Sequence, residues 1–196
     1  AALQASLGYF EAAGYTVEDG KLTAAPEGAK LTYEMTIGAS GSGDHPSFAI
    51  LTDAKQALEK IGFTLEINDV TDANIMWDKL NAGTAEMWAA AWQATVDPDM
   101  YQIYHSDSVK SNYYHINDAT LDQDIIDARS SADQEYRKSV YKQCLDIILD
   151  WAVEVPIYQR QNCIIYSPER LNADTFTKDV STFYYWYKDI ETMEMN

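Results

Sequence analysis

The sequence is poor in cysteine and in basic residues, and each shortage argues against a class of protein. Two cysteines among 196 residues are too few for a disulfide framework. Lys and Arg number 14 against 31 Asp and Glu, so the formal net charge is −17 at pH 7. A chain this acidic repels the phosphates of nucleic acids and anionic lipid head groups alike. Nucleic acid and membrane surfaces are therefore poor partners for it.

Long apolar runs are also missing. No stretch reaches the roughly 18 apolar residues that a membrane-spanning helix needs. The longest candidates, such as residues 163–166, have the length of a strand. The chain begins at Ala1 without an initiator Met or a charged-then-apolar leader, so we expect either a removed leader or a piece of a longer protein.

The motifs that hold phosphates, nucleophiles or zinc are absent as well. The sequence contains no GxGxxG, GxxxxGK[ST], GxSxG or HExxH pattern. The three histidines, His45, His105 and His115, have spacings that fit no zinc template. We therefore expect no cofactor and no metal site.

The two cysteines have the surroundings of core residues. Cys144 and Cys163 each lie within an apolar pattern, with no CxxC spacing and no Cys/His cluster. This setting favours two buried free thiols, because an unpaired cysteine behaves as a small apolar residue. A single disulfide between them is the alternative.

Apolar periodicity in the first half of the chain is typical of an α/β domain. Apolar residues recur at helical spacing at Leu3, Leu7 and Phe10, and the pattern stops at Gly14, which predicts a short opening helix. Alternating apolar and polar residues predict strands at 31–37 and 63–67. The helical stripe over 48–61 lies between them, so the segment predicts a βαβ unit.

The pattern continues with a further helix and a further strand. Asp72 can cap a short helix, and residues 85–92 predict a third strand despite their alanines. No internal repeat or charge block marks a second domain. The fold class expected from the whole pattern is α/β, with a sheet flanked by helices.

The second half combines a long irregular stretch with the clearest helix of the chain. Residues 93–114 lack periodicity, and long ordered loops in compact domains are usually functional. Residues 140–151 predict a helix whose apolar face includes Trp151, while Arg137 belongs to the opposite, charged face. Residues 153–166 predict two strand-like runs, and the aromatic-rich tail has no clean period.

Aromatic and acidic residues around the long loop are the candidates for chemistry. The aromatic side chains suit either the wall of a small-molecule pocket or the core; both interpretations are open for Trp92, and the core is favoured for Trp77 and Trp88. Asp97 and Asp99 have the arrangement of paired carboxylates for acid–base work, but a turn and a solvated helix face explain the acidic residues better. The aromatic set is Trp77, Trp88, Trp92, Tyr101, Tyr104, Tyr113 and Tyr114, and the second acidic set is Asp118, Asp122, Asp124 and Asp127.

The order of short motifs along the chain resembles a known family. The motifs are Ala12-Ala13-Gly14-Tyr15 with Asp19-Gly20, Leu58-Glu59-Lys60-Ile61-Gly62-Phe63, Gly83 with Glu86-Met87 and Trp92, Asp97-Pro98-Asp99, Leu121-Asp122 with Ala128-Arg129, Arg137 with Tyr141, and Val155-Pro156-Ile157-Tyr158. This order is similar to the C-terminal lobe of the family 5 extracellular solute-binding proteins, which serve oligopeptide, dipeptide and nickel ABC importers. The resemblance covers nearly the whole chain.

The resemblance implies a periplasmic-binding-protein-like (type II) lobe with a mixed sheet flanked by helices. Residues 1–196 would be one C-terminal ligand-binding lobe of a larger two-lobed receptor, and 168–196 a segment returning toward the missing N-terminal lobe. Such a receptor is not an enzyme. It would bind a peptide or another small polar solute and deliver it to ABC permease subunits. It would be extracellular or periplasmic, a lipoprotein that meets the membrane only through a lipid anchor outside this chain.

The resemblance also implies a set of ligand-binding residues. Trp92, Gln93 and Thr95 match the end of the cleft-lining strand, and Tyr158 is a weaker match. The loop aromatic Tyr113 completes the set together with Asp97.

One position departs from the family. Thr95 stands where peptide-binding relatives have an aspartate that grips the peptide's α-amino group, and a neutral hydroxyl cannot supply that ion pair. Either Asp97 replaces it through a shifted loop, or the ligand is an oligosaccharide or another polar solute. A carbohydrate-binding module and an acidic hydrolase using Asp97 and Asp99 are the alternative functions.

Overall fold

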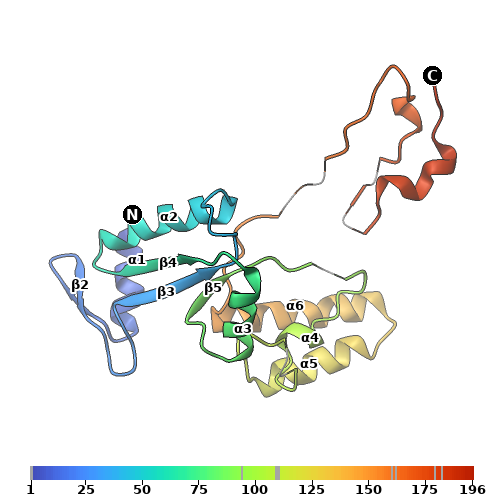
Figure 1. The fold of residues 1–196 in the computed structure, drawn as a ribbon. Coiled ribbons are helices and arrows are strands. Elements are labelled where there is room, and N and C mark those ends of the chain that lie inside the picture. Colours follow the sequence, from blue (N-terminus) through green and yellow to red (C-terminus); the bar gives the residue numbers. More distant parts are fainter. Residues whose placement is uncertain are drawn as a thin grey trace. The chain divides into compact units, whose positions relative to one another are not determined.

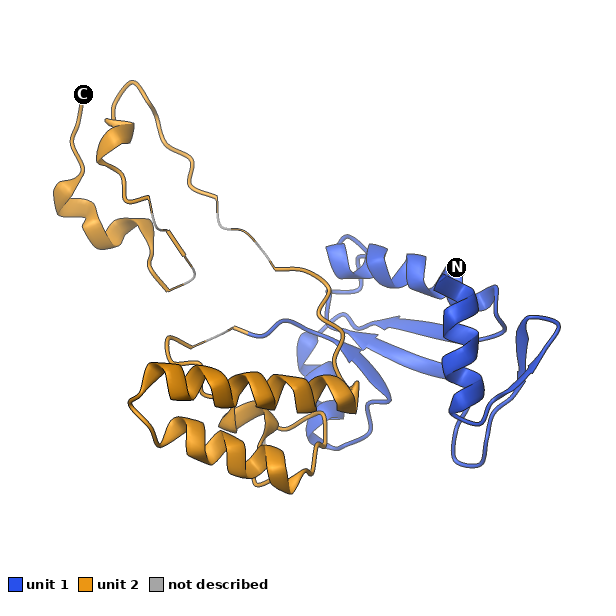
Figure 2. Ribbon diagram, turned by 180° about the vertical axis from the view of Figure 1, so that it is seen from behind, with its two compact units in different colours: residues 1–92 blue, residues 93–196 orange. Residues whose placement is uncertain are grey.

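The computed structural model describes residues 2–93, 95–108, 111–159, 161, 163–178, 180–181 and 183–196. The chain divides into two compact units, Ala1–Trp92 and Gln93–Asn196 (Figure 2). The assignment of residues 1–196 to one lobe stays a prediction.

Unit 1 is built on a parallel three-stranded sheet. Its strands β3 (Thr32–Ile37), β4 (Thr64–Asp69) and β5 (Met87–Ala89) lie in the order β4-β3-β5 (Figure 1). Parallel neighbours need a crossover, and the helices α2 (Pro46–Glu59) and α3 (Ala73–Asn81) provide the two connections. The predicted βαβ unit is confirmed.

Both crossover helices begin at residues that favour a helix N-terminus. At α2, Pro46 lies in the first turn and the Nδ1 atom of His45 accepts a hydrogen bond from the Ser47 N–H. At α3, the carboxylate of Asp72 accepts from the Asn74 N–H at 2.9 Å, as a helix cap should.

The two faces of the sheet differ in polarity. Toward α2 the strands contribute Met35, Ile37 and Leu65 to a core that includes Leu51. The other face carries Glu34, which pairs with Lys79 of α3 and accepts hydrogen bonds from the side chains of Asn68 and Thr36, both at 3.1 Å. Lys79 and these two donors lower the pKa of Glu34.

A helix and a hairpin form a second core in unit 1. Helix α1 (Ala2–Ala12) confirms the predicted opening helix, and the antiparallel pair β1 (Thr16–Glu18) and β2 (Lys21–Ala24) was not predicted. Leu7 and Leu22 pack with Ile61 and Phe63. Gly62 makes this approach possible, because a Cβ atom there would lie 2.6 Å from the Leu22 carbonyl oxygen and its φ is +84°.

The third strand is shorter than predicted. Residues 85–92 were expected to be extended, but β5 ends at Ala89. Its partner β3 ends at Ile37, and Ala89 is the last residue paired with it. Ala90, Ala91 and Trp92 lie beyond the last residue of β3, so no strand residue of β3 is there to pair with them.

Unit 2 is built around a pair of helices. Helix α4 (Tyr101–Tyr104) lies within the stretch predicted to be irregular, and α5 (Ala119–Arg129) and α6 (Gln134–Trp151) pack against each other. Asp118 and Asp133 cap these two helices through backbone N–H groups. Their core contains Ile116, Leu121, Ile125, Ala128, Val140, Tyr141, Cys144 and Ile148.

Three predictions for unit 2 are wrong. Residues 153–166 form no strand within the part that the structure describes, because exposed side chains such as Val155 and Ile165 pack against no layer. Cys163 is exposed, although both cysteines are free as expected. Trp151 is 41% exposed because it lies in the last turn of α6, past the buried face.

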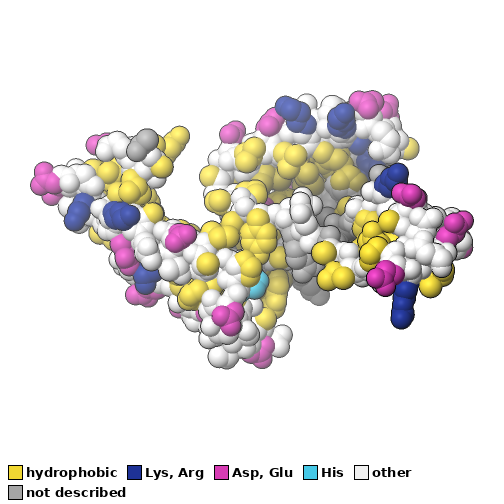
Figure 3. Space-filling model, turned by 90° about the horizontal axis from the view of Figure 1, so that it is seen from above, with side chains coloured by type: hydrophobic (Ala, Val, Ile, Leu, Met, Phe, Trp, Pro, Cys, Tyr) yellow, Lys and Arg dark blue, Asp and Glu magenta, His cyan; other side chains and the backbone are white. Residues whose placement is uncertain are grey.

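The end of the chain buries no side chain among its described residues from 152 onward. The described residues there include two short 3-10 helices, η1 (Ala173–Thr175) and η2 (Trp186–Thr192), and a bridge between Leu171 and Met195. Figure 3 shows apolar side chains open on the surface among charged ones. No helix in the described residues has the length and apolarity needed to cross a membrane.

Candidate functional site

The carboxyl edge of the unit 1 sheet is where this topology places a ligand. The three strands run parallel, so their carboxyl ends share one edge. The chain leaves β3 toward β4 on one side and later adds β5 on the other (Figure 1). Ligands of open α/β sheets bind outside the carboxyl ends at such a reversal. The loop 38–45 and residues 90–92 therefore border the candidate site.

Trp92 lies three residues beyond the end of β5. Its indole packs edge-to-face on Trp88, with ring centroids 6.3 Å apart and planes at 83°. Trp88 is half-buried opposite Thr36 of β3, whereas Trp92 is 38% exposed. The half-buried Trp88 ring thus contacts the more exposed ring of Trp92, and the geometry suits Trp92 as a rigid apolar wall.

The loop after β3 folds around a carboxylate that sequence reasoning missed. Asp69, the last residue of β4, accepts hydrogen bonds from the backbone N–H groups of Ala39 at 3.0 Å, Gly41 at 3.1 Å and Gly43 at 3.1 Å. The glycine-rich composition of 38–43 is the one signal in the sequence that points to such a loop.

In unit 2, the segment after Trp92 is held by two ion pairs. Asp97 pairs with Arg137 of α6 at 2.6 Å, and Asp99 pairs with Arg129 of α5 at 3.0 Å. Thr95 donates its hydroxyl to the carbonyl oxygen of Asp97 at 2.5 Å. Each carboxylate therefore faces an arginine, which is not the paired-acid arrangement that a hydrolase needs.

Arg137, which the sequence placed on the charged face of its helix, is largely covered in the structure. Its side chain is 12% exposed, and its guanidinium lies 5.6 Å from the ring centroid of Tyr141. The pairing with Asp97 raises the pKa of Arg137. A charge with this little exposure needs an anionic partner, and only the fold could show that Asp97, forty residues earlier, supplies it.

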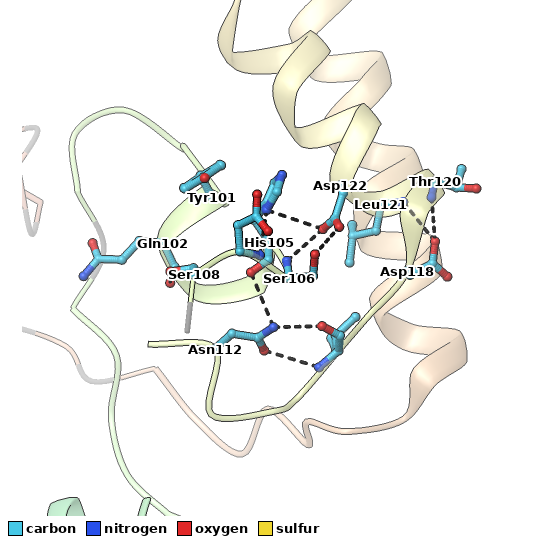
Figure 4. A network of polar contacts seen from close by, with 12 residues as sticks. Tyr101, Gln102, His105, Ser106, Ser108, Asn112, Asp118, Thr120, Leu121 and Asp122 are labelled. Carbon is cyan, nitrogen blue, oxygen red and sulfur yellow. Dashed lines mark hydrogen bonds and ion pairs between the residues drawn. The ribbon is translucent and has the colours of Figure 1, made fainter. Parts of the chain in front are cut away.

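His105 of unit 2 belongs to an internal polar network (Figure 4). His105 is 7% exposed, and its Nδ1 atom accepts from the Asp107 N–H and lies 3.7 Å from Asp122. Asp122 also accepts from the N–H of Ser106 at 2.8 Å and from its hydroxyl. Asn112 donates to the Ile116 carbonyl at 2.8 Å. These bonds close a loop onto the start of α5.

The remaining predicted site residues are accessible to different degrees. Gln93 is exposed, Tyr113 is half-buried, and Tyr158 is 52% exposed. Trp92 belongs to unit 1 and the other five predicted residues belong to unit 2. The structure brings Thr95 and Asp97 into contact with each other.

Metal binding finds no support in the described residues. They contain no group of three or more His, Cys, Asp and Glu side chains that could hold an ion. A carboxylate such as Asp122 is already committed to Ser106.

Comparisons with known proteins identify the fold. The structure is similar to the oligopeptide-binding protein AppA from Bacillus subtilis in complex with a nonapeptide, with 22% identity, a TM-score of 0.58, and coverage of 70% of this chain and 27% of that chain. It is similar to NikZ from Campylobacter jejuni in complex with Ni(L-His), with 19% identity, a TM-score of 0.61, and coverage of 77% and 30%. It is also similar to NikA from Brucella suis in complex with Fe(III)-EDTA, with 21% identity, a TM-score of 0.56, and coverage of 74% of this chain and 29% of that chain.

Sequence comparison alone does not reach this result, because no family model and no curated protein matches the chain. The chain covers less than a third of the length of each of the three similar structures. The described residues have a periplasmic-binding-protein-like fold, which they share with part of each of these three binding proteins.

Proposed function

We propose that this chain is the ligand-binding lobe of a solute-binding receptor, a non-catalytic protein that captures a peptide or another small polar solute for an ABC importer. The observation that supports the proposal is the fold shared, over 70–77% of the chain, with an oligopeptide-binding protein and with NikZ in complex with Ni(L-His). In such receptors closure of two lobes around the solute provides the burial that binding requires.

The proposed contacts follow from accessibility. In unit 1, Trp92 has an exposed ring that packs edge-to-face on Trp88 near the carboxyl edge of the sheet. In unit 2, the proposed ligand contacts are three predicted residues from the segment after Trp92 and two tyrosines. These residues are Gln93, Thr95, Asp97, Tyr113 and Tyr158.

The proposal includes a second lobe, permease subunits and a location outside the cytoplasmic membrane, with any lipid anchor outside this chain. Residues 168–196 would then return to the second lobe. Support comes from their side chains: the run from Phe183 to Tyr187 is between 38% and 49% exposed at every described position. Exposed aromatic clusters of this kind mark surfaces that a partner covers.

The test uses the intact protein that carries this chain. Calorimetry would measure binding of trialanine, N-acetyl-trialanine, maltotriose and the nickel–histidine complex. We expect saturable binding of one of these classes, weakened at least tenfold by Trp92→Ala. Tyr9→Ala, which removes a ring that is 79% exposed on α1, serves as the aromatic control and should leave affinity unchanged. Failure to bind any of the four probes, or turnover of one of them, would contradict the proposal.

A further inference from the structure

Three backbone N–H groups converge on the carboxylate of Asp69. Ala39 and Gly41 donate to its Oδ1 atom, and Gly43 donates to its Oδ2 atom. The donors are alternate residues of one loop, and the acceptor lies 26 to 30 residues away at the end of the neighbouring strand. Hydrogen bonds to an ionised carboxylate are roughly twice as strong as neutral ones.

The loop has the backbone of an anion-binding cradle. Backbone N–H groups that turn toward one point form a concave nest, which binds anions such as phosphate. Here φ is +64° at Ser40, +69° at Gly41 and +73° at Gly43. A Cβ atom at Gly41 would lie 2.9 Å from Thr71, so both the conformation and the space favour glycine.

The position of the cradle matters for the ligand. It follows β3, the central strand of the parallel sheet, and leads into α2. Glycine-rich loops between a strand and a helix are the usual place for a phosphate group. In this protein the Asp69 carboxylate accepts the hydrogen bonds that such a loop would donate to a phosphate. The start of α2 is also committed, because Pro46 has no N–H and the Ser47 N–H donates to His45.

We propose that Asp69 is a positioning residue of the solute site. Its carboxylate fills the cradle, holds the loop 39–43 in place beside the carboxyl edge, and excludes phosphate and carboxylate groups of a solute from this loop. The inference rests on the proposed function, because it assumes that the solute binds at this edge. The groups that a solute presents to the loop are then neutral or cationic, in keeping with the acidic chain.

The first experiment empties the cradle. In Asp69→Gly, we expect hydrogen exchange of the Gly41 and Gly43 amides to become at least about tenfold faster than in the parent protein. Titration with sodium formate or inorganic phosphate, at constant ionic strength with chloride as reference, should give saturable amide shifts at these residues and restore slow exchange. The parent protein should show no such shifts. Asp72→Gly, which removes a carboxylate that caps α3, should show no anion response in the loop.

The second experiment links the cradle to binding. In the intact protein, Asp69→Gly should weaken binding of whichever probe binds, among trialanine, maltotriose and the nickel–histidine complex, by about tenfold, and formate should reverse this loss. Asp69→Asn keeps one oxygen for Ala39 and Gly41 and loses the acceptor for Gly43, so its affinity should be intermediate. A residue that only supports the fold would lower thermal stability without a gain of anion binding.

The outcomes separate the cradle from the proposed function. Absence of formate and phosphate shifts in Asp69→Gly, or equal phosphate binding by the parent protein, would overturn the cradle. Unchanged probe affinity in both Asp69 variants would overturn the positioning role while the receptor function stands. A formate response without binding of any probe would support the cradle and contradict the proposed function.

Discussion

Two adjacent isoleucines of α5 allow a sharp test of how unit 2 is packed. Ile125 is fully buried in the core with Leu121 and Cys144, whereas Ile126 is 37% exposed. Ile125→Ala removes three carbon atoms from a filled site, and such substitutions cost about 2–5 kcal/mol because a cavity remains. For Ile126→Ala we expect a loss of about 1 kcal/mol or less, since its site is already open to solvent.

The pair controls for everything except burial. Both substitutions replace isoleucine with alanine one position apart in the same helix, so the gain in helix propensity, up to about 0.5 kcal/mol, is the same for each. The difference between the two unfolding free energies therefore reports the packing at Ile125. We expect that difference to be about 1–5 kcal/mol.

Urea unfolding followed by far-ultraviolet circular dichroism measures the two free energies. The chain has two compact units, so a probe within unit 2 is also needed. Modification of Cys144 by a thiol reagent during the titration supplies it, because this buried thiol belongs to the same core cluster as Ile125. Equal losses in the two variants, or a larger loss for Ile126→Ala, would show that α5 presents a different face to the core.

Further predictions concern thiols, acid stability and specificity. A thiol reagent should label Cys163 quickly and Cys144 only on unfolding, because burial raises the pKa of Cys144 to about 11; two fast thiols would contradict this. The pKa of Glu34 is lowered by Lys79, so its stabilising contribution should be present above about pH 5 and be lost on acidification below the ordinary glutamate pKa of about 4.3. Glu34→Gln should flatten the fall of the urea midpoint between about pH 5 and 3, and an unchanged fall would refute this role. Thr95→Asp in the intact protein should improve calorimetric affinity for trialanine relative to N-acetyl-trialanine, and no change in this ratio would count against a cleft-facing Thr95.

The fold was predictable where apolar residues repeat over many positions. Helix α2 and its flanking strands were readable because each buries one regular face against the same core. The hairpin at 16–24 was missed because strands of three and four residues are too short to show a period. The strands expected at 153–166 have the right composition, but a strand also needs a partner, and composition cannot supply one.

The site was harder to predict because its polar contacts are long-range. Trp92 was predicted to bind the ligand from its place in the order of motifs, and its side chain is exposed; its role stays a prediction. Asp69 was missed because its role depends on a loop 26 to 30 residues earlier in the chain. Arg137 was placed on the charged face of its helix, since helical periodicity cannot show that Asp97 lies within reach of that face.

The ion pairs of unit 2 bear on which solutes the proposed receptor would accept. A free α-amino group binds well where a carboxylate is ready to pair with it. Asp97 and Asp99 each have an arginine within 3.0 Å, so an incoming ammonium group would have to displace Arg137 or Arg129 to reach them. Thr95 carries no charge and donates to the backbone of Asp97. Under the proposed function, this segment would favour solutes bound through neutral hydrogen bonds and ring contacts over peptides held by their amino terminus.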